Sequence, residues 1–196
     1  FFLTPGGAFI DAADPANVQE TITAIVSNSG MSLVSNVFVP IGLLHILFGV
    51  LVLQGNLRGN GNGDALSRAG ALLIFVGILG WVTTAGVGLA VAGADAIPVP
   101  QAIAPFSALY SATLSIGTLS GILAGLGFLA LALAISTRDD YNKMFALVAA
   151  ITAVVVIVAS AIGLDSSQLE AMSYVQGVCY LIHSVWFITL GLKLIK

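Results

Sequence analysis

The fold is decided by residues 144–164, MFALVAAITAVVVIVASAIGL, a stretch without a single charged side chain. A helix needs about 20 apolar residues to cross a bilayer, because the hydrocarbon core is about 30 Å thick and a helix rises about 1.5 Å per residue. Four more charge-free stretches are at least as long, at residues 21–57, 69–94, 96–137 and 171–192. With polar and Pro-rich ends trimmed, the five stretches predict spanning helices at residues 31–53, 70–92, 106–136, 144–164 and 171–193.

The composition supports a membrane protein. The chain has 196 residues with only six Lys or Arg and nine Asp or Glu, while 58% of its residues are apolar. Soluble domains carry charge on about a quarter of their residues, so an ordinary soluble domain is excluded. Nucleic acid is excluded as a partner, because six cations cannot form the basic surface that phosphate contacts need. The stretches also lack the alternation of barrel strands. The predicted fold is therefore all-α, a multi-pass transmembrane helical bundle of five spanning helices in a lipid bilayer.

The cations predict how the bundle lies in the membrane. All of them follow the first, third or fifth predicted helix: Arg58, Arg68, Arg138, Lys143, Lys193 and Lys196. The opposite side holds no Lys or Arg but carries Asp11, Asp14, Glu20, Asp95, Asp165 and Glu170. Because cytoplasmic loops carry the excess of Lys and Arg, the N-terminus is predicted to be extracytoplasmic and the C-terminus cytoplasmic, in the cell (plasma) membrane.

Residues 1–30 are predicted to form an extracytoplasmic N-terminal segment, before a transmembrane domain at residues 31–196. Asp14-Pro15 suits an N-cap followed by Pro at the first helical position, and apolar residues then recur at helical spacing, at Val18, Ile22, Ile25 and Val26. An amphipathic helix of about 12 residues is expected, with its apolar side on the membrane surface or on a partner subunit. The first residues, Phe1-Phe2-Leu3, suit either a removed signal peptide or the end of a sixth span.

Gly117, Gly121 and Gly125 form a GxxxGxxxG pattern within the third predicted helix. In lipid, helices associate mainly through van der Waals contact over such small residues. This face is predicted to pack closely, either against another helix of the same chain or against a helix of another subunit.

The outer loop before the third helix contains Pro98, Pro100 and Pro105. Each proline lacks a backbone N–H, and each restrains the residue before it. This loop is therefore predicted to be stiff and extended.

Two histidines lie near the middle of predicted spans, His45 in the first and His183 in the fifth. Both helices run in the same direction, so the two imidazoles differ in depth by only about 3 Å at the helical rise and could face a common internal site. Three roles are open: hydrogen bonding within the bundle, axial ligation of a haem or of a chlorophyll-type magnesium, and a metal site or proton path. A dedicated zinc or copper site is disfavoured, because no carboxylate and only Cys179 lies nearby.

The fifth predicted helix carries a polar stripe. Gln176, Tyr180 and His183 recur at i, i+4 and i+7, with Cys179 alongside. Polar side chains in a span face protein, water or a ligand rather than lipid. No Asp, Glu, Lys or Arg lies at the centre of any span, which argues against a proton pump or a charge-coupled transporter.

These features predict a non-catalytic integral subunit of a larger membrane complex, which scaffolds other integral subunits and holds a haem or pigment if the histidines are ligands. No catalytic constellation of nucleophile and base is present in the sequence, so no catalytic site is expected. The alternative is an oligomeric channel or carrier for a small neutral solute.

Overall fold

The computed structural model describes residues 5–7, 9–59, 63–94 and 96–194. It is an all-helical bundle of five long helices: α2 (Ser29–Leu57), α3 (Asp64–Ala92), α4 (Val99–Ser136), α5 (Lys143–Ile162) and α6 (Leu169–Leu194). Each of them is long and apolar enough to cross a membrane, which confirms the prediction of five long apolar helices. The observed helices extend beyond the predicted ones at most ends, because polar residues near the boundaries continue the helices instead of ending them.

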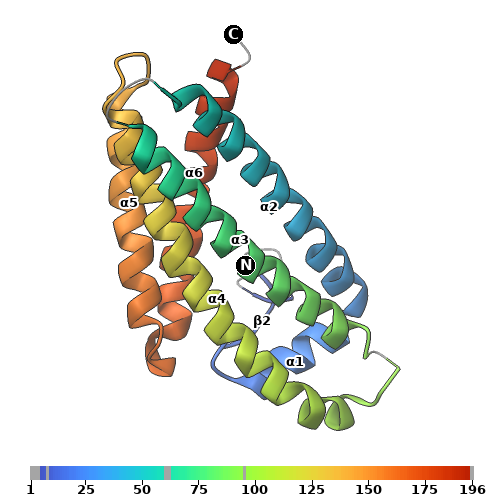
Figure 1. Ribbon diagram of the computed structural model, residues 1–196. Coiled ribbons are helices and arrows are strands. Elements are labelled where there is room, and N and C mark those ends of the chain that lie inside the picture. Colours follow the sequence, from blue (N-terminus) through green and yellow to red (C-terminus); the bar gives the residue numbers. More distant parts are fainter. Residues whose placement is uncertain (1–4, 8, 60–62, 95, 195–196) are drawn as a thin grey trace.

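The bundle has two chemically different ends (Figure 1). The α2–α3 and α4–α5 connections and the end of α6 lie together at one end, with Arg58, Arg68, Arg138, Lys143 and Lys193, and we call this the cationic end. The opposite, acidic end holds α1 (Val18–Ser27), the α3–α4 connection and the short 3-10 turn η1 (Ser166–Gln168). Phe1-Phe2-Leu3, Asp95 and Lys196 lie outside the described residues.

The prediction for the proline-containing loop was wrong. Helix α4 begins at Val99, with Pro98 at its N-cap, so Pro100 and Pro105 lie inside it. Pro100 falls in the first turn, where a backbone N–H has no partner within the helix and its loss costs little. Pro105 removes one hydrogen bond of the second turn, which the helix tolerates because the turns on both sides continue.

The N-terminal segment packs on its own chain. Helix α1 begins after Asn17, whose side chain accepts a hydrogen bond from the Glu20 N–H at 3.2 Å, so Asp14 is not the N-cap that the sequence predicted. Its buried Ile22 and Val26 lie in a small cluster with Val91, Ala94 and Ala102 at the acidic end of the bundle. The apolar side of α1 therefore packs against the ends of α3 and α4, instead of the predicted membrane surface or partner. Two short strands, β1 (Pro5–Gly6) and β2 (Ile10–Ala12), pair before it.

The main core fills the cationic half of the bundle. Its fully buried members include Val50 and Leu53 from α2, Ile74 from α3, and Leu131 and Ile135 from α4. Polar side chains are buried in both halves: Ser67 and the Gln54 amide lie in the cationic half, and a group of hydroxyl and amide side chains lies nearer the acidic end.

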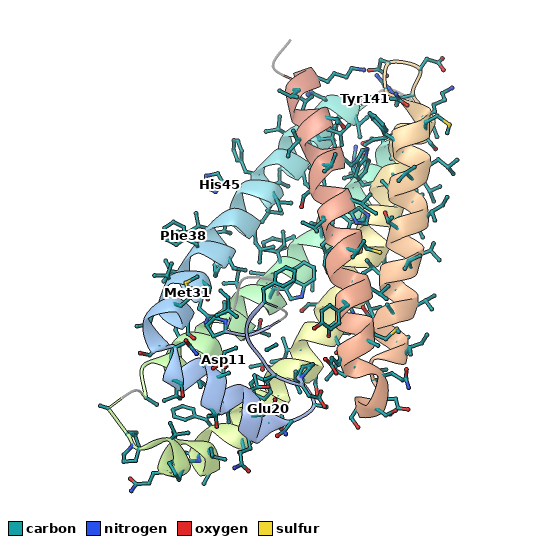
Figure 2. The ribbon with its side chains drawn as sticks, turned by 180° about the vertical axis from the view of Figure 1, so that it is seen from behind. Asp11, Glu20, Met31, Phe38, His45 and Tyr141 are labelled. Atoms are coloured by element: carbon teal, nitrogen blue, oxygen red, sulfur yellow. The ribbon has the colours of Figure 1, made fainter. Side chains whose placement is uncertain are left out.

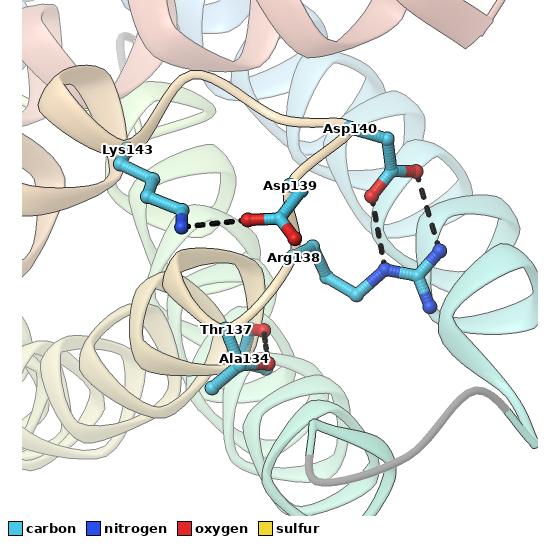
Figure 3. A network of polar contacts seen from close by, with 6 residues as sticks. All are labelled: Ala134, Thr137, Arg138, Asp139, Asp140 and Lys143. Atoms are coloured by element: carbon cyan, nitrogen blue, oxygen red, sulfur yellow. Dashed lines mark hydrogen bonds and ion pairs between the residues drawn. The ribbon is translucent and has the colours of Figure 1, made fainter.

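The α4–α5 connection is held by ion pairs at the cationic end (Figure 3). Arg138 donates to both carboxylate oxygens of Asp140, at 3.0 and 3.2 Å, and Lys143 Nζ donates to Asp139 Oδ1 at 2.8 Å. The Arg138 guanidinium holds the pKa of Asp140 below its ordinary value, and Lys143 does the same for the pKa of Asp139. The Asn142 side chain accepts from the Met144 and Phe145 N–H groups, which starts α5 at Lys143.

Candidate functional site

His183 lies inside the bundle with both ring nitrogens in hydrogen bonds. Its side chain is only 2% exposed. Nδ1 lies 2.9 Å from the Cys179 carbonyl oxygen one turn earlier in α6, and Nε2 lies 3.1 Å from the Ala149 carbonyl oxygen of α5. The Thr152 hydroxyl is 3.3 Å from the same Nε2, and the Phe128 ring stacks on the imidazole with 4.7 Å between ring centroids.

These contacts favour one tautomer of a neutral His183. A neutral imidazole has one N–H and one acceptor nitrogen. Nδ1 faces only the Cys179 carbonyl, so the tautomer that satisfies both nitrogens has Nδ1–H donating to this carbonyl and Nε2 accepting from the Thr152 hydroxyl, with no hydrogen bond from Nε2 to the nearby Ala149 carbonyl. In this arrangement neither nitrogen is open to a metal, and the stacked Phe128 occupies the space beside the ring. The geometry therefore favours hydrogen bonding within the bundle over axial ligation at this position.

His45 is on the outside of the bundle. Figure 2 shows Met31, Phe38 and His45 along the outer flank of α2, with the imidazole directed away from the other helices. Nδ1 lies 2.7 Å from the Ile41 carbonyl oxygen, and Nε2 has no hydrogen-bond partner among the described residues. The prediction that His45 and His183 face a common internal site was wrong. Their depths match, but His45 lies two residues from the buried Leu47, which is about 200° around the helix.

The surface around His45 is exposed and apolar. Gly42 and Gly49 are exposed, and a Cβ at either glycine would meet nothing within 4 Å. The exposed rings of Phe38 and Phe48 flank the imidazole along the same side of α2. We call Phe38, Gly42, His45, Phe48 and Gly49 the His45 face.

The polar stripe of α6 divides between two places. Cys179 is buried, and its carbonyl accepts from His183. Gln176 and Tyr180 turn toward α4, where a Cβ at Gly121 would lie 3.4 Å from Tyr180 OH and 3.7 Å from Gln176 Oε1. Ser160 of α5 reaches the same point, with its Oγ at 2.8 Å. We call Gly121, Ser160, Gln176 and Tyr180 the Gly121 cluster.

Ser160 was missed by the sequence reasoning. It lies near the end of α5 among aliphatic residues, where a single hydroxyl usually bonds the carbonyl four residues earlier and needs no other partner. Ser160 lies about one turn from the end of α5 at the acidic end of the bundle. This position is the signal in the sequence that could have placed Ser160 level with Gln176 of α6.

The three glycines of the GxxxGxxxG pattern have different surroundings. A Cβ at Gly125 would lie 2.8 Å from Ile157 Cγ1 and 3.4 Å from the Ala153 carbonyl oxygen, so both Gly121 and Gly125 are directed toward α5 of the same chain. A Cβ at Gly117 would meet nothing within 4 Å. The contribution of Gly117, Gly121 and Gly125 to the stability of the protein stays a prediction.

A close approach of backbone to backbone lies elsewhere, between α3 and α4. A Cβ at Gly70 would lie 2.8 Å from the Gly127 carbonyl oxygen, and a Cβ at Gly127 would lie 2.8 Å from that of Gly70. Gly63 and Gly77 lie seven residues before and after Gly70, and their Cβ positions would meet the Ala134 and Ser120 carbonyl oxygens at 2.8 and 2.9 Å. This α3 glycine row, Gly63, Gly70 and Gly77, is filled along its length by the backbone of α4.

Among the described residues, no group of three or more His, Cys, Asp or Glu side chains could hold a metal ion. The chain matches no known protein family, no curated protein and no solved structure. The His45 face and the Gly121 cluster are therefore the features of the molecule that point to a function.

Proposed function

We propose that the protein is a non-catalytic integral subunit of a larger plasma-membrane complex and that the His45 face of α2 binds another subunit. The observation that carries this proposal is an exposed imidazole near mid-depth of a helix that is apolar on all sides. An imidazole N–H or lone pair facing hydrocarbon is costly, because lipid offers no hydrogen bond. A neighbouring chain or a bound group that covers His45 removes this cost.

The glycines beside His45 support a helix as the covering element. Gly42 and Gly49 are seven residues apart, so they lie on nearly the same side of α2. The α3 row has the same seven-residue spacing and receives α4 there. The exposed row on α2 offers another helix the same kind of close approach.

A tetrapyrrole is the cofactor that this face suits best. The bond between Nδ1 and the Ile41 carbonyl orients the ring and leaves Nε2 directed outward, as in axial histidine ligands of haem and of chlorophyll-type magnesium. The open space at Gly42 and Gly49 would let a flat macrocycle lie close to the helix. If a haem or pigment is held, the proposal assigns it to His45 and not to the enclosed His183.

The apolar core supports a subunit over a channel formed within a single chain. Leu53, Ile74 and Leu131 are at most 1% exposed and fill the cationic half from three helices. A polar solute passing through one chain would have to displace these side chains. A channel would therefore need a path between copies of the chain.

Native mass spectrometry in mild detergent tests the proposal. The wild-type protein is expected to carry different chains at fixed stoichiometry, and Gly49→Leu is expected to release them by filling the open row. Gly86→Leu is the matched control, because Gly86 is an exposed glycine of α3 with nothing within 4 Å of its Cβ position. Assemblies that contain only copies of this chain would favour the channel instead. A visible absorption band lost in His45→Leu would identify the tetrapyrrole.

The proposed orientation places the acidic end outside the cell and the cationic end in the cytoplasm, as the distribution of cations predicts. Single cysteines at Ala65 and Ser166, exposed positions at the cationic and acidic ends, test it in a Cys179→Ser background. A membrane-impermeant thiol reagent added to intact cells should label only the cysteine at position 166. Labelling at position 65 alone would show that the orientation is opposite to the proposed one. Labelling at both positions would contradict the five-span topology.

A further inference from the structure

Two buried hydroxyls of the Gly121 cluster have no hydrogen-bond partner among the described residues. The side chain of Ser160 is 0% exposed, and neither its Oγ nor Tyr180 OH is bonded. A hydroxyl in a helix can usually donate to the carbonyl four residues earlier, as Ser120 Oγ does to Ile116 O at 2.7 Å and Ser184 Oγ does to Tyr180 O at 2.8 Å. Ser160 does not use this option, so it lacks even the hydrogen bond that its own helix could offer.

The unbonded hydroxyls converge on one point. The oxygens of Ser160, Tyr180 and Gln176 come from two helices and lie 2.8, 3.4 and 3.7 Å from the place where a Cβ at Gly121 would be. Because Gly121 has no side chain, these three polar atoms face the same glycine with no Cβ between them. Buried polar groups in proteins are nearly always satisfied by protein or by an ordered molecule, because an unsatisfied one carries its full desolvation cost.

The surroundings define how this point is reached and what it can hold. Gly117 lies one turn closer to the acidic end, is half-buried, and has open space where its Cβ would be. Trp81 closes another side, with its ring edge-on to Tyr180 and 5.3 Å between centroids. The cluster contains hydroxyl and amide groups and no charged side chain, so it offers both donors and acceptors to a neutral molecule.

We propose that the Gly121 cluster is a binding site for one small neutral molecule that both donates and accepts hydrogen bonds, and that water occupies it in the resting protein. The molecule bridges Ser160 Oγ, Tyr180 OH and Gln176 Oε1 and enters from the acidic end past Gly117. Three partners are the usual number for a buried water. Toward the cationic end of α4 the fully buried side chains of Leu131 and Ile135 close the interior, so the site is a pocket and not part of a pore.

The change in Tm caused by Ser160→Ala should be negative if the site is occupied and zero or positive if it is empty. If a molecule bridges the cluster, removing Ser160 Oγ breaks one of its bonds, and Tm falls by about 2 to 4 °C for each kcal/mol lost in a chain of this size. If the site is empty, the substitution removes an unsatisfied hydroxyl, and Tm stays the same or rises. Ser184→Ala is the matched control, because that hydroxyl is exposed and bonded to its own helix. Tyr180→Phe should lower Tm as well, and the double variant should lose less than the sum of the two.

Hydroxyl-radical labelling by synchrotron radiolysis in ¹⁸O-water tests the occupant directly. Tyr180 should incorporate ¹⁸O in the wild-type protein although its hydroxyl is buried, because bound water is the local source of radicals. Gly121→Ala should abolish this labelling, since the added Cβ would lie 2.8 Å from Ser160 Oγ, whereas Gly117→Ala should preserve it. Absence of label on Tyr180 in the wild-type protein, or a Tm that is unchanged or rises in Ser160→Ala, would overturn the proposal.

Discussion

Two rows of glycines in this molecule have the same spacing and different surroundings. On α3, Gly63, Gly70 and Gly77 recur every seven residues and lie against the backbone of α4. On α2, Gly42 and Gly49 are also seven residues apart, and their Cβ positions are open. The comparison teaches that such a row predicts close approach but does not identify the partner. The filled row stabilises this chain, and the open one is available to another.

The largest expected effect is at the filled row. Gly70→Leu would force a side chain into a position where even a Cβ lies 2.8 Å from the Gly127 carbonyl oxygen, and backbone cannot move aside as a side chain can. We expect a loss of about 3 kcal/mol of stability, the upper end of overpacking effects. Equilibrium unfolding in detergent measures it. Gly49→Leu should leave the stability of the isolated chain unchanged, and an equal loss in both variants would remove the distinction between the rows.

An intermediate effect is expected along the GxxxGxxxG row of α4. Gly121→Leu should cost about 1 to 3 kcal/mol, because Ser160 Oγ and Tyr180 OH lie close to its Cβ position. Gly117→Leu, one turn away with open space, should cost much less. The melting temperatures of the two variants, compared in the same detergent, check this order. If Gly121→Leu melts like the wild type, the row does not contribute to packing.

The two histidines also differ in their surroundings, because His183 is buried within this chain and His45 is exposed on its surface. His183→Leu should destabilise the isolated chain by about 1 to 3 kcal/mol, because it removes the imidazole's buried hydrogen bonds to the Cys179 carbonyl and the Thr152 hydroxyl and the stack on Phe128. His45→Leu should be neutral or slightly stabilising in the isolated chain, since it replaces an exposed imidazole on an apolar face. Thermal melts of both variants decide it. A larger loss for His45 would mean that α2 is packed differently.

The smallest effect is expected at the α4–α5 connection, away from both rows. The pKa values of Asp139 and Asp140 are lowered by Lys143 and Arg138, so these ion pairs contribute stability above the ordinary carboxyl pKa of 3.8 and lose it as pH falls through the lowered values. The groups are exposed, and exposed pairs contribute little. Melting curves of the wild type and of Asp140→Asn should converge as the pH falls below that range. A difference that grows on acidification would contradict the sign.

The five helices could be predicted because charge-free length is a property of sequence alone. The depth of His45 and His183 followed from the same counting. Which way each imidazole faces could not be predicted, because α2 is apolar on all sides, and no periodicity distinguishes its buried residues Leu47, Val50 and Leu53 from the exposed Phe38, Leu44 and Phe48. Ser160 could not be predicted either, since its role depends on the space left by Gly121 on a different helix.

Photo-crosslinking from the His45 face in native membranes tests the central claim most directly. A photoreactive phenylalanine analogue at Phe48, which is 70% exposed on α2, is compared with the same analogue at Leu119, which is 57% exposed on α4. The account predicts that the probe at position 48 forms a crosslink to one different polypeptide and that the probe at position 119 reacts with lipid. Crosslinks from position 48 to lipid alone, or only to another copy of this chain, would contradict the proposal that the His45 face binds another subunit.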